Sequence, residues 1–138
     1  MTTQTPRVPT PRDLVARDSA RRAAEMIAPG TLLRGERFRP LFERGIHTSG
    51  MTPHTRLVAL ALLAFANGGT GDLPAERQPY LAGLVEATGL TTGQVVVQLR
   101  ALEARGWIHR DSSGSARYEE ALLRPVIPRH ALERLRAS

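Results

Sequence analysis

The amino-acid sequence predicts a mainly helical protein with a small β-hairpin, an α+β fold. Three observations support this prediction. Apolar residues recur at helical spacing, as with Val95, Leu99 and Leu102, which fall at i, i+4 and i+7 on one helix face. Helix-start signals precede such stretches, a Thr-Pro pair at 52–53 and a Thr-x-x-Gln capping box at 91–94. Toward the C-terminus the helical spacing ends, and short strands separated by a polar turn are expected.

The composition favours one compact domain with a core of aliphatic residues. The chain has 138 residues, of which 41% are hydrophobic and only 4% aromatic, so Leu, Val and Ala must build the core. It has no cysteine, which excludes a disulfide framework and a thiolate zinc site. The first ten residues lack the apolar run of a signal peptide, and the longest apolar run is ten residues. We therefore expect a cytoplasmic protein with no membrane segment.

The net charge is +6, and all 19 basic residues are arginines. Residues 1–44 hold nine Arg against five acids, residues 45–103 hold three against four, and residues 104–138 hold seven against four. The excess positive charge therefore lies in the two flanks. This distribution favours a protein whose flanks hold nucleic-acid phosphates, and solvated basic tails are the alternative explanation.

The N-terminal part is expected to hold a disordered arm, a helix and a connector. Residues 1–10 contain prolines and threonines with little apolar content and are predicted to be a disordered arm. An amphipathic helix is predicted at 11–27, with an Ala-rich face that could lie on its own domain or pack against a second copy. The segment 11–50 is thus a possible dimerisation element. Within the connector, 31–50, an irregular helix or a short strand is expected near 42–47.

Order resumes at Thr52-Pro53, where a central buried helix is predicted to run to Ala66. A glycine-rich loop follows at 67–72. It lacks the preceding strand and the Gly-Lys-Ser/Thr sequence of a phosphate-binding P-loop. Leu73-Pro74 is expected to form a short strand, and a further helix is predicted from Pro79 to Thr88.

A tight turn and a second helix follow. Gly89 is a residue that tolerates positive φ at a helix end, and Leu90 returns to the core. The helix predicted at 92–105 buries the face already described. Its other face presents a separate set of residues to a partner: Gly93, Val97, Arg100 and Ala104.

The C-terminal part is predicted to form a hairpin and a helical tail. Gly106 ends the preceding helix, residues 107–110 read as a strand with Trp107 over the core, 111–115 as a turn and 116–119 as the returning strand. In the tail, 121–138, a short helix is expected at 128–136. It would bury Leu132 and Leu135, expose Arg129, Arg134 and Arg136, and could join a dimer interface.

The stretch from residue 84 to residue 108 resembles the winged helix-turn-helix domain of bacterial transcriptional regulators, and of regulators of replication or transfer in mobile elements. The residues that fit the pattern are Leu84, Thr88, Gly89, Leu90, Thr91, Val95, Leu99, Leu102, Glu103, Arg105, Gly106 and Ile108. The resemblance implies a winged helix-turn-helix domain over residues 51–120, with an N-terminal helical extension.

The resemblance also implies a function. Double-stranded DNA is the expected partner, with helix 92–105 in the major groove, the wing 107–119 on the backbone or minor groove, and a homodimer on a two-fold-symmetric site. The residues expected to contact DNA are Thr91, Thr92, Gly93, Gln94, Val96, Val97, Arg100, Arg110, Ser113 and Arg117.

The valines of the recognition helix depart from the family pattern, in which Arg, Ser or Lys is common. They leave Gln94, Gln98 and Arg100 as hydrogen-bonding readers, with thymine-methyl contacts from Val96 and Val97. A weakly specific, nucleoid-type DNA binder and a protein-docking winged module therefore stand as alternatives to a sequence-specific regulator.

No catalytic site, metal site or cofactor is predicted, and we do not expect an enzyme. The four histidines are dispersed and show no metal-ligand spacing, and the acids form no constellation: Glu103 and Glu133, for example, are explained by helical charge pairing. No binding site for a small-molecule effector can be inferred.

Overall fold

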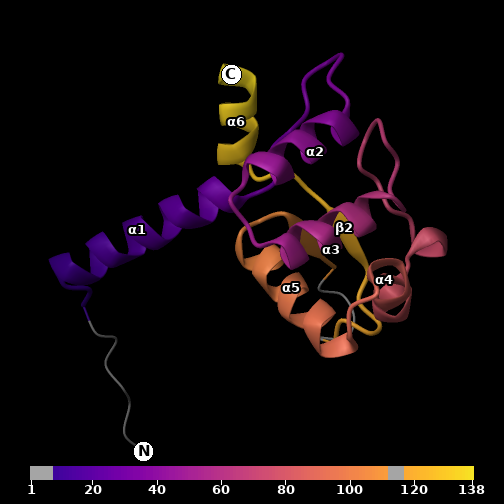
Figure 1. Ribbon diagram of the computed structural model, residues 1–138. Helices are drawn as coiled ribbons and strands as arrows, with labels where there is room; N and C mark the ends of the chain where they lie inside the picture. The colour runs from indigo at the N-terminus through magenta and orange to yellow at the C-terminus, as the bar shows by residue number, and fades with distance from the viewer. Residues whose placement is uncertain (1–7, 112–116) are drawn as a thin grey trace, which may run out of the picture.

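The computed structural model describes residues 8–111 and 117–138. In chain order its elements are α1 (Pro11–Ile27), α2 (Phe38–Thr48), α3 (Pro53–Leu63), the 3₁₀ helix η1 (Ala75–Arg77), α4 (Tyr80–Thr88), α5 (Thr92–Ala104), β1 (Ile108–Arg110), β2 (Leu123–Pro125) and α6 (Arg129–Ala137) (Figure 1). The prediction of a mainly helical protein with a small antiparallel sheet is confirmed. Of the arm expected at 1–10, residues 1–7 lie outside the described residues. None of the described helices combines the length and the apolar character needed to cross a membrane.

The core gathers around α3, which contacts α2, α4, α5 and β2. As predicted, α3 is central, but it ends at Leu63 and not at Ala66, and it is not buried on all sides, because Leu57 is 41% exposed. The core extends from Phe38 to Leu135. It therefore crosses the boundaries expected at residues 50 and 120, and α2 and α6 belong to the same folded unit as the helices between them.

The segment near 42–47, expected to be an irregular helix or a short strand, belongs to a regular helix, α2. Its buried residues Phe38, Phe42, Gly45 and Ile46 follow a helical period. Pro40 does not break the helix because it lies in the first turn, where the backbone N–H has no intrahelical partner. Phe42 is completely buried, and its ring meets Trp107 edge-on at 5.7 Å between centroids. Trp107 thus covers the core as predicted.

No strand forms at Leu73-Pro74, contrary to expectation, since η1 follows directly. A side chain takes the place of the missing strand. The Gln78 amide nitrogen donates to the carbonyls of Leu73 (3.1 Å) and Leu123 (2.7 Å), and its oxygen accepts from the Leu123 N–H (3.1 Å). One amide therefore joins the segment before η1 to the edge of β2.

The turn between α4 and α5 is as predicted. Gly89 has φ of +75° and its N–H donates to the Val85 carbonyl at 2.9 Å. The capping box is also confirmed: Thr91 Oγ1 accepts from the Gln94 N–H (3.2 Å), and Gln94 Oε1 accepts from the Thr91 N–H (2.9 Å). These local bonds fix the start of α5 at Thr92.

β1 pairs with β2, and residues 117–119 form a bend and a turn, so the return strand predicted at 116–119 is wrong for the part that the structure describes. The register joins Ile108 to Pro125 and Arg110 to Leu123. In β2 burial alternates, since Leu123 and Pro125 are buried and the residue between them is exposed. Tyr118 lies in a turn, and its side chain is buried. The backbone at this position therefore does not continue as a strand. The expected turn tip, 112–115, lies outside the described residues.

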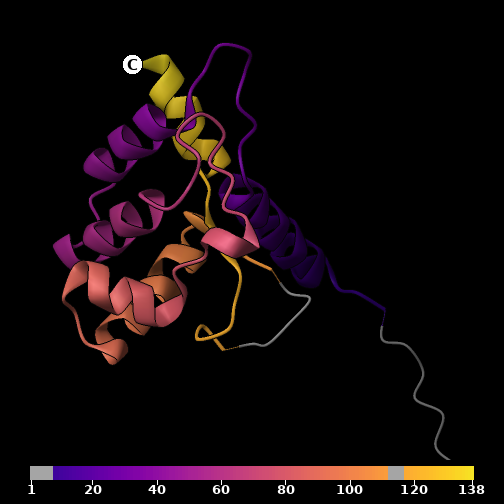
Figure 2. The ribbon, with the colours of Figure 1, turned by 90° about the vertical axis from the view of Figure 1, so that its right-hand side faces the viewer.

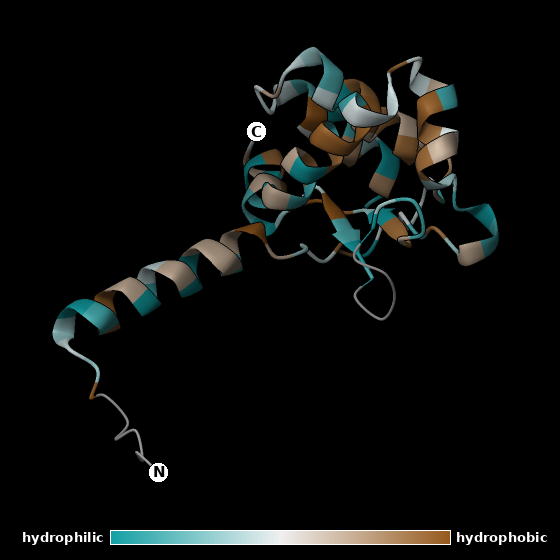
Figure 3. Ribbon diagram, turned by 90° about the horizontal axis from the view of Figure 1, so that it is seen from below, coloured by the Kyte–Doolittle hydropathy of each residue, from teal (hydrophilic) through white to brown (hydrophobic). Residues whose placement is uncertain are grey.

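α1 is the predicted amphipathic helix, but it is packed against the body only at its C-terminal end and projects away from it (Figures 1 and 3). None of its residues is buried. The end is held by backbone contacts with the start of α6: Arg129 N–H donates to the Ala28 carbonyl, and Gly30 N–H to the Ile127 carbonyl, each at 2.8 Å. α1 therefore leaves the body in a defined direction.

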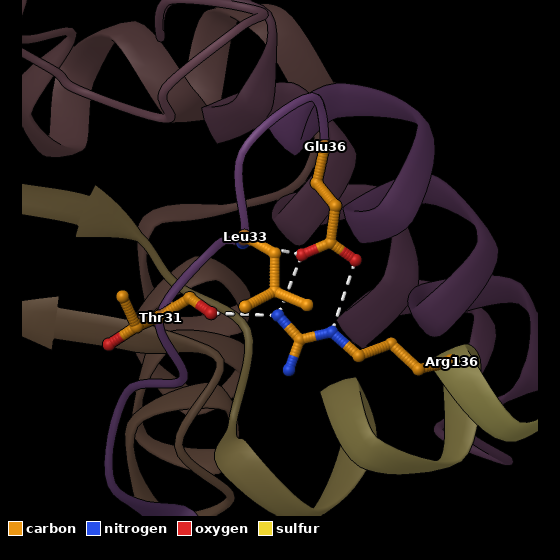
Figure 4. A network of polar contacts seen from close by, with 4 residues as sticks. All are labelled: Thr31, Leu33, Glu36 and Arg136. Atoms are coloured by element: carbon orange, nitrogen blue, oxygen red, sulfur yellow. Dashed lines mark hydrogen bonds and ion pairs between the residues drawn. The ribbon is translucent and has the colours of Figure 1, made fainter.

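α6 is the predicted terminal helix, with Leu132 and Leu135 buried. Arg136 is exposed, as expected, and its guanidinium also binds the connector (Figure 4). Its guanidinium donates to Glu36 Oε1 (2.6 Å), Glu36 Oε2 (3.1 Å) and the Thr31 carbonyl (2.8 Å), and the Leu33 N–H donates to Glu36 Oε1 (2.6 Å). The hydrogen bonds from Arg136 lower the pKa of Glu36 to about 2.

Candidate functional site

The outward face of α5 consists of Gly93, Val97, Arg100 and Ala104, and all four residues are exposed. The opposite face, with Val95, Leu99 and Leu102, is buried as predicted. Val97 is 59% exposed, an unusual value for a branched apolar side chain. The outward face is thus smooth and apolar, with one cationic side chain.

Thr91, Thr92 and Gln94 lie at the N-terminal end of this face and are exposed. Thr91 and Gln94 also form the capping box, so part of the polar capacity of each side chain serves the helix start. None of the three lines the groove described next, whose first lining residue on α5 is Val96, so the structure does not bring them together with Arg110 and Arg117.

Gln98 does not belong to the outward face, contrary to our expectation for a base reader. Its Oε1 accepts a hydrogen bond from the Thr55 hydroxyl at 2.6 Å, and Thr55 is itself buried in α3. Burial of a hydroxyl requires a hydrogen-bond partner, and Gln98 supplies it. The side chain therefore joins α5 to α3.

A groove of about 660 Å³ lies beside the outward face of α5. We call it the α5 groove. It is lined by residues from α5, from β1 and from the turn at 117–120: Val96, Arg100, Glu103, Ala104, Arg110, Arg117, Tyr118 and Glu119. Four residues expected to contact DNA, Val96, Arg100, Arg110 and Arg117, are thus brought together, although they span more than twenty positions of the sequence.

Glu103 organises one wall of the α5 groove. Its carboxylate pairs with the Arg110 guanidinium at 3.1 Å and accepts a hydrogen bond from the Tyr118 hydroxyl at 2.6 Å. The Arg110 guanidinium also lies over the Tyr118 ring, 4.9 Å from its centroid. Burial, together with the bond to Glu103, raises the pKa of Tyr118 to about 12. The phenol therefore stays protonated and remains a donor at neutral pH.

The groove carries three arginines against two glutamates. Arg110 is engaged by Glu103, whereas Arg100 is exposed on the outward face and Arg117 lies on the turn side of the groove. Ser113, also expected to contact DNA, lies outside the described residues. The arrangement can bind an anion between cationic side chains, over an apolar floor made by Val96 and Ala104.

Two residues of this site, Glu103 and Tyr118, were not anticipated. Helical charge pairing explained Glu103 from the sequence, but its partners come from β1 and from the turn. The only available signal was that Tyr118 is the single aromatic residue in the polar stretch after Trp107. An isolated aromatic residue in such a segment favours inward packing.

No cluster of three or more His, Asp or Glu side chains suited to a metal ion occurs in residues 8–111 and 117–138. Comparisons with protein-family models, with curated proteins and with solved structures found no match to this chain. The functional argument therefore rests on the geometry of α5 and its groove.

Proposed function

We propose that the chain is a DNA-binding protein with a winged helix-turn-helix domain, most simply a transcriptional regulator that reads double-stranded DNA. In this proposal α4 and α5 form the helix-turn-helix, α5 enters the major groove, and β1 with the segment leading to β2 forms the wing. The wing then includes residues up to β2, beyond the limit at residue 119 that the sequence suggested.

One observation carries the proposal: the exposed, outward face of α5 is continuous with a groove lined by three arginines. A helix of 13 residues is about 20 Å long, and the major groove of B-DNA, about 12 Å wide, admits one helix. With α5 in that groove, Arg100 would face base edges and Arg117 would face a phosphate strand. Duplex recognition combines contacts to base edges, which specify the sequence, with contacts to phosphates, which position the protein, and this surface offers an arginine for each.

The small residues of the outward face support close approach to bases. Gly93 and Ala104 leave room, and Val97 can contact a thymine methyl group. Because Gln98 points inward and Gln94 serves the cap, Arg100 is the main polar reader. This shortage of polar readers favours, as a second candidate, a weakly specific DNA binder of the nucleoid type. A protein-docking module uses the same exposed valine, and the test below distinguishes it.

The test is titration of a labelled duplex by fluorescence anisotropy, with a random-sequence pool and a duplex selected for binding, each at several salt concentrations. Arg117→Ala should weaken binding to both duplexes alike and reduce the slope of log affinity against log salt by about one unit. Arg100→Ala should instead reduce discrimination between the duplexes, by roughly 1–3 kcal/mol for a lost bidentate guanine contact.

Arg34→Ala is the matched control, because it removes the same charge from the segment 33–36 beside α6, at the end of the molecule opposite to α5 (Figures 1 and 2). Equal losses for both duplexes with Arg100→Ala would favour the weakly specific binder. Absence of DNA binding by the unmodified protein, even at low salt, would refute the proposal and favour protein docking.

We further propose that the protein is a homodimer joined through α1. Ala16, Ala20, Ala23 and Ile27 are spaced by four, three and four residues, the spacing of a coiled-coil seam. None of the 17 residues of α1 is buried, and most helical stability in proteins comes from packing of an apolar face, so a covered seam would stabilise the helix. Asp13 lies at the next position of the seam, three residues before Ala16. A parallel pair in register would place the two copies of Asp13 against each other, whereas an antiparallel pair that overlaps over 16–27 avoids this contact.

Sedimentation velocity tests the dimer. Ala20→Glu introduces a charge into the seam and should yield a monomer, whereas Leu14→Glu places the same charge on the opposite side of α1 and should leave the dimer intact. A dimer that survives Ala20→Glu would place the interface elsewhere, with α6 the next segment to examine.

A further inference from the structure

We propose that Glu103 acts as an internal substitute for a DNA phosphate on Arg110, and thereby limits binding to non-specific DNA. This inference rests on the proposed DNA-binding function, because it concerns the same groove. It assigns to a carboxylate of the recognition helix a role in specificity that the sequence pattern does not suggest.

The geometry of the pair supports this role. Glu103 Oε1 lies 3.1 Å from an Arg110 guanidinium nitrogen, and the two side chains are 32% and 28% exposed. The pair is therefore neither deeply buried nor fully solvated, and a ligand that enters the α5 groove can reach it. The Tyr118 hydroxyl holds the other carboxylate oxygen at 2.6 Å, and the Tyr118 ring lies under the guanidinium. Glu103 is thus held in position by a second side chain.

Carboxylate and phosphate compete for the same guanidinium donors, because both present two acceptor oxygens in a similar arrangement. Arg110 lies on β1, at the start of the segment that we assign to the wing, where a phosphate contact is expected. While Glu103 holds it, Arg110 contributes little to phosphate binding. The Glu103 charge also repels any phosphate that approaches the groove.

The consequence is a smaller electrostatic contribution to affinity for every sequence. Non-specific affinity depends almost entirely on the number of phosphates neutralised, so masking one arginine lowers it, whereas base contacts by Arg100 are unaffected. The pair therefore raises the ratio of specific to non-specific binding. Loss of the carboxylate charge should remove this competitor for the Arg110 guanidinium and increase the number of phosphate contacts by one.

The experiment measures the affinity of full-length protein for a random-sequence duplex between 50 and 200 mM salt. Glu103→Gln retains an oxygen that accepts from Tyr118 but removes the charge that pairs with Arg110. Its slope of log affinity against log salt should be steeper than that of the unmodified protein by about 0.9. The ratio of its affinity for this duplex to that of the unmodified protein should then fall about 3.5-fold between 50 and 200 mM salt.

Three further variants isolate the cause. Glu119→Gln removes the same charge from the same groove, but the structure gives no ion pair for Glu119 among the described residues. Its slope of log affinity against log salt should lie within half a unit of that of the unmodified protein. Arg110→Ala alone should change the slope little, because the arginine is already engaged. The double variant Glu103→Gln/Arg110→Ala should lose the gain of Glu103→Gln.

The outcomes are distinguishable. If the unmodified protein binds DNA but Glu103→Gln matches it in slope, or if Glu119→Gln has an equal effect, the inference is overturned while the proposed function stands. A full unit of slope lost by Arg110→Ala alone would also overturn it, since Arg110 would already contact phosphate. If no variant binds DNA, the proposed function fails.

Discussion

Substitution of Gly89 tests the turn on which the orientation of α5 depends. The residue has φ of +75°, and a Cβ built there would meet no heavy atom within 4 Å. Any cost of substitution therefore comes from the backbone and not from a clash. An L-residue in this conformation costs about 1–2 kcal/mol, and a β-branched side chain costs more. Loss of unfolded-state entropy offsets roughly 0.4–1 kcal/mol of this when glycine is replaced by alanine.

The expected order of stability is therefore Gly, then Asn, then Ala, then Val, with Gly89→Val destabilised by more than ~1 kcal/mol, or roughly 3–6 °C in melting temperature. Asn is tolerated because its side chain can stabilise the left-handed conformation. Thermal unfolding followed by circular dichroism measures the series. Gly93→Ala is the control: its Cβ position is also open but its backbone is helical, so it should be neutral or stabilising. Stability that is unchanged in Gly89→Val, or that rises with side-chain size, would refute the assignment.

Three more predictions follow from contacts described above. Gln78→Leu should destabilise by about 2–4 kcal/mol in chemical denaturation, because two carbonyls and one N–H lose their partner; a loss below about 0.5 kcal/mol would show that water replaces the amide. The lowered pKa of Glu36 implies stability that is fully present above pH 4.5 and is lost as the pH falls toward 2, so Glu36→Gln should melt below the unmodified protein at pH 7 and should converge with it in acid. A constant difference in melting temperature across that range would exclude the charge as the cause. Gly106→Ala should release the end of α1, because Gly106 has φ of +82° and an added methyl would overlap the Ile27 carbonyl oxygen; amide exchange at residues 24–27 should accelerate while α5 stays protected.

The sequence was sufficient to predict those features of the fold that depend on contacts between residues close together in the chain. The start of α5 depends on bonds between residues three apart, and the end of α4 depends on the freedom of Gly89, so both were predicted. A regular helix over the length of α2 was not predicted, because Pro40 and Gly45 resemble helix breakers. Gly45 has a tertiary cause: a Cβ there would lie 2.6 Å from the Trp107 ring, more than sixty residues later. No spacing rule contains that contact.

The candidate site shows the same division. Helical periodicity correctly placed Val97 and Arg100 on the exposed side of α5. It could not show that Gln98 is drawn to Thr55, or that Arg110 is held by Glu103, since both contacts join different elements. The return strand failed for a related reason. Residues 116–119 follow the turn closely enough to suggest a tight hairpin, but pairing forms only where burial alternates, at β2.

The Gln78 amide has a consequence for solubility as well as for stability. An unpaired strand edge presents backbone groups that another chain can extend, which is a common route to aggregation. On β2 one side chain occupies two of these groups, at Leu123, from outside the sheet. Because an amide carries no charge, this protection does not change with pH. The backbone of Leu123 is therefore protected from pairing with another chain by a residue that does not itself belong to a strand.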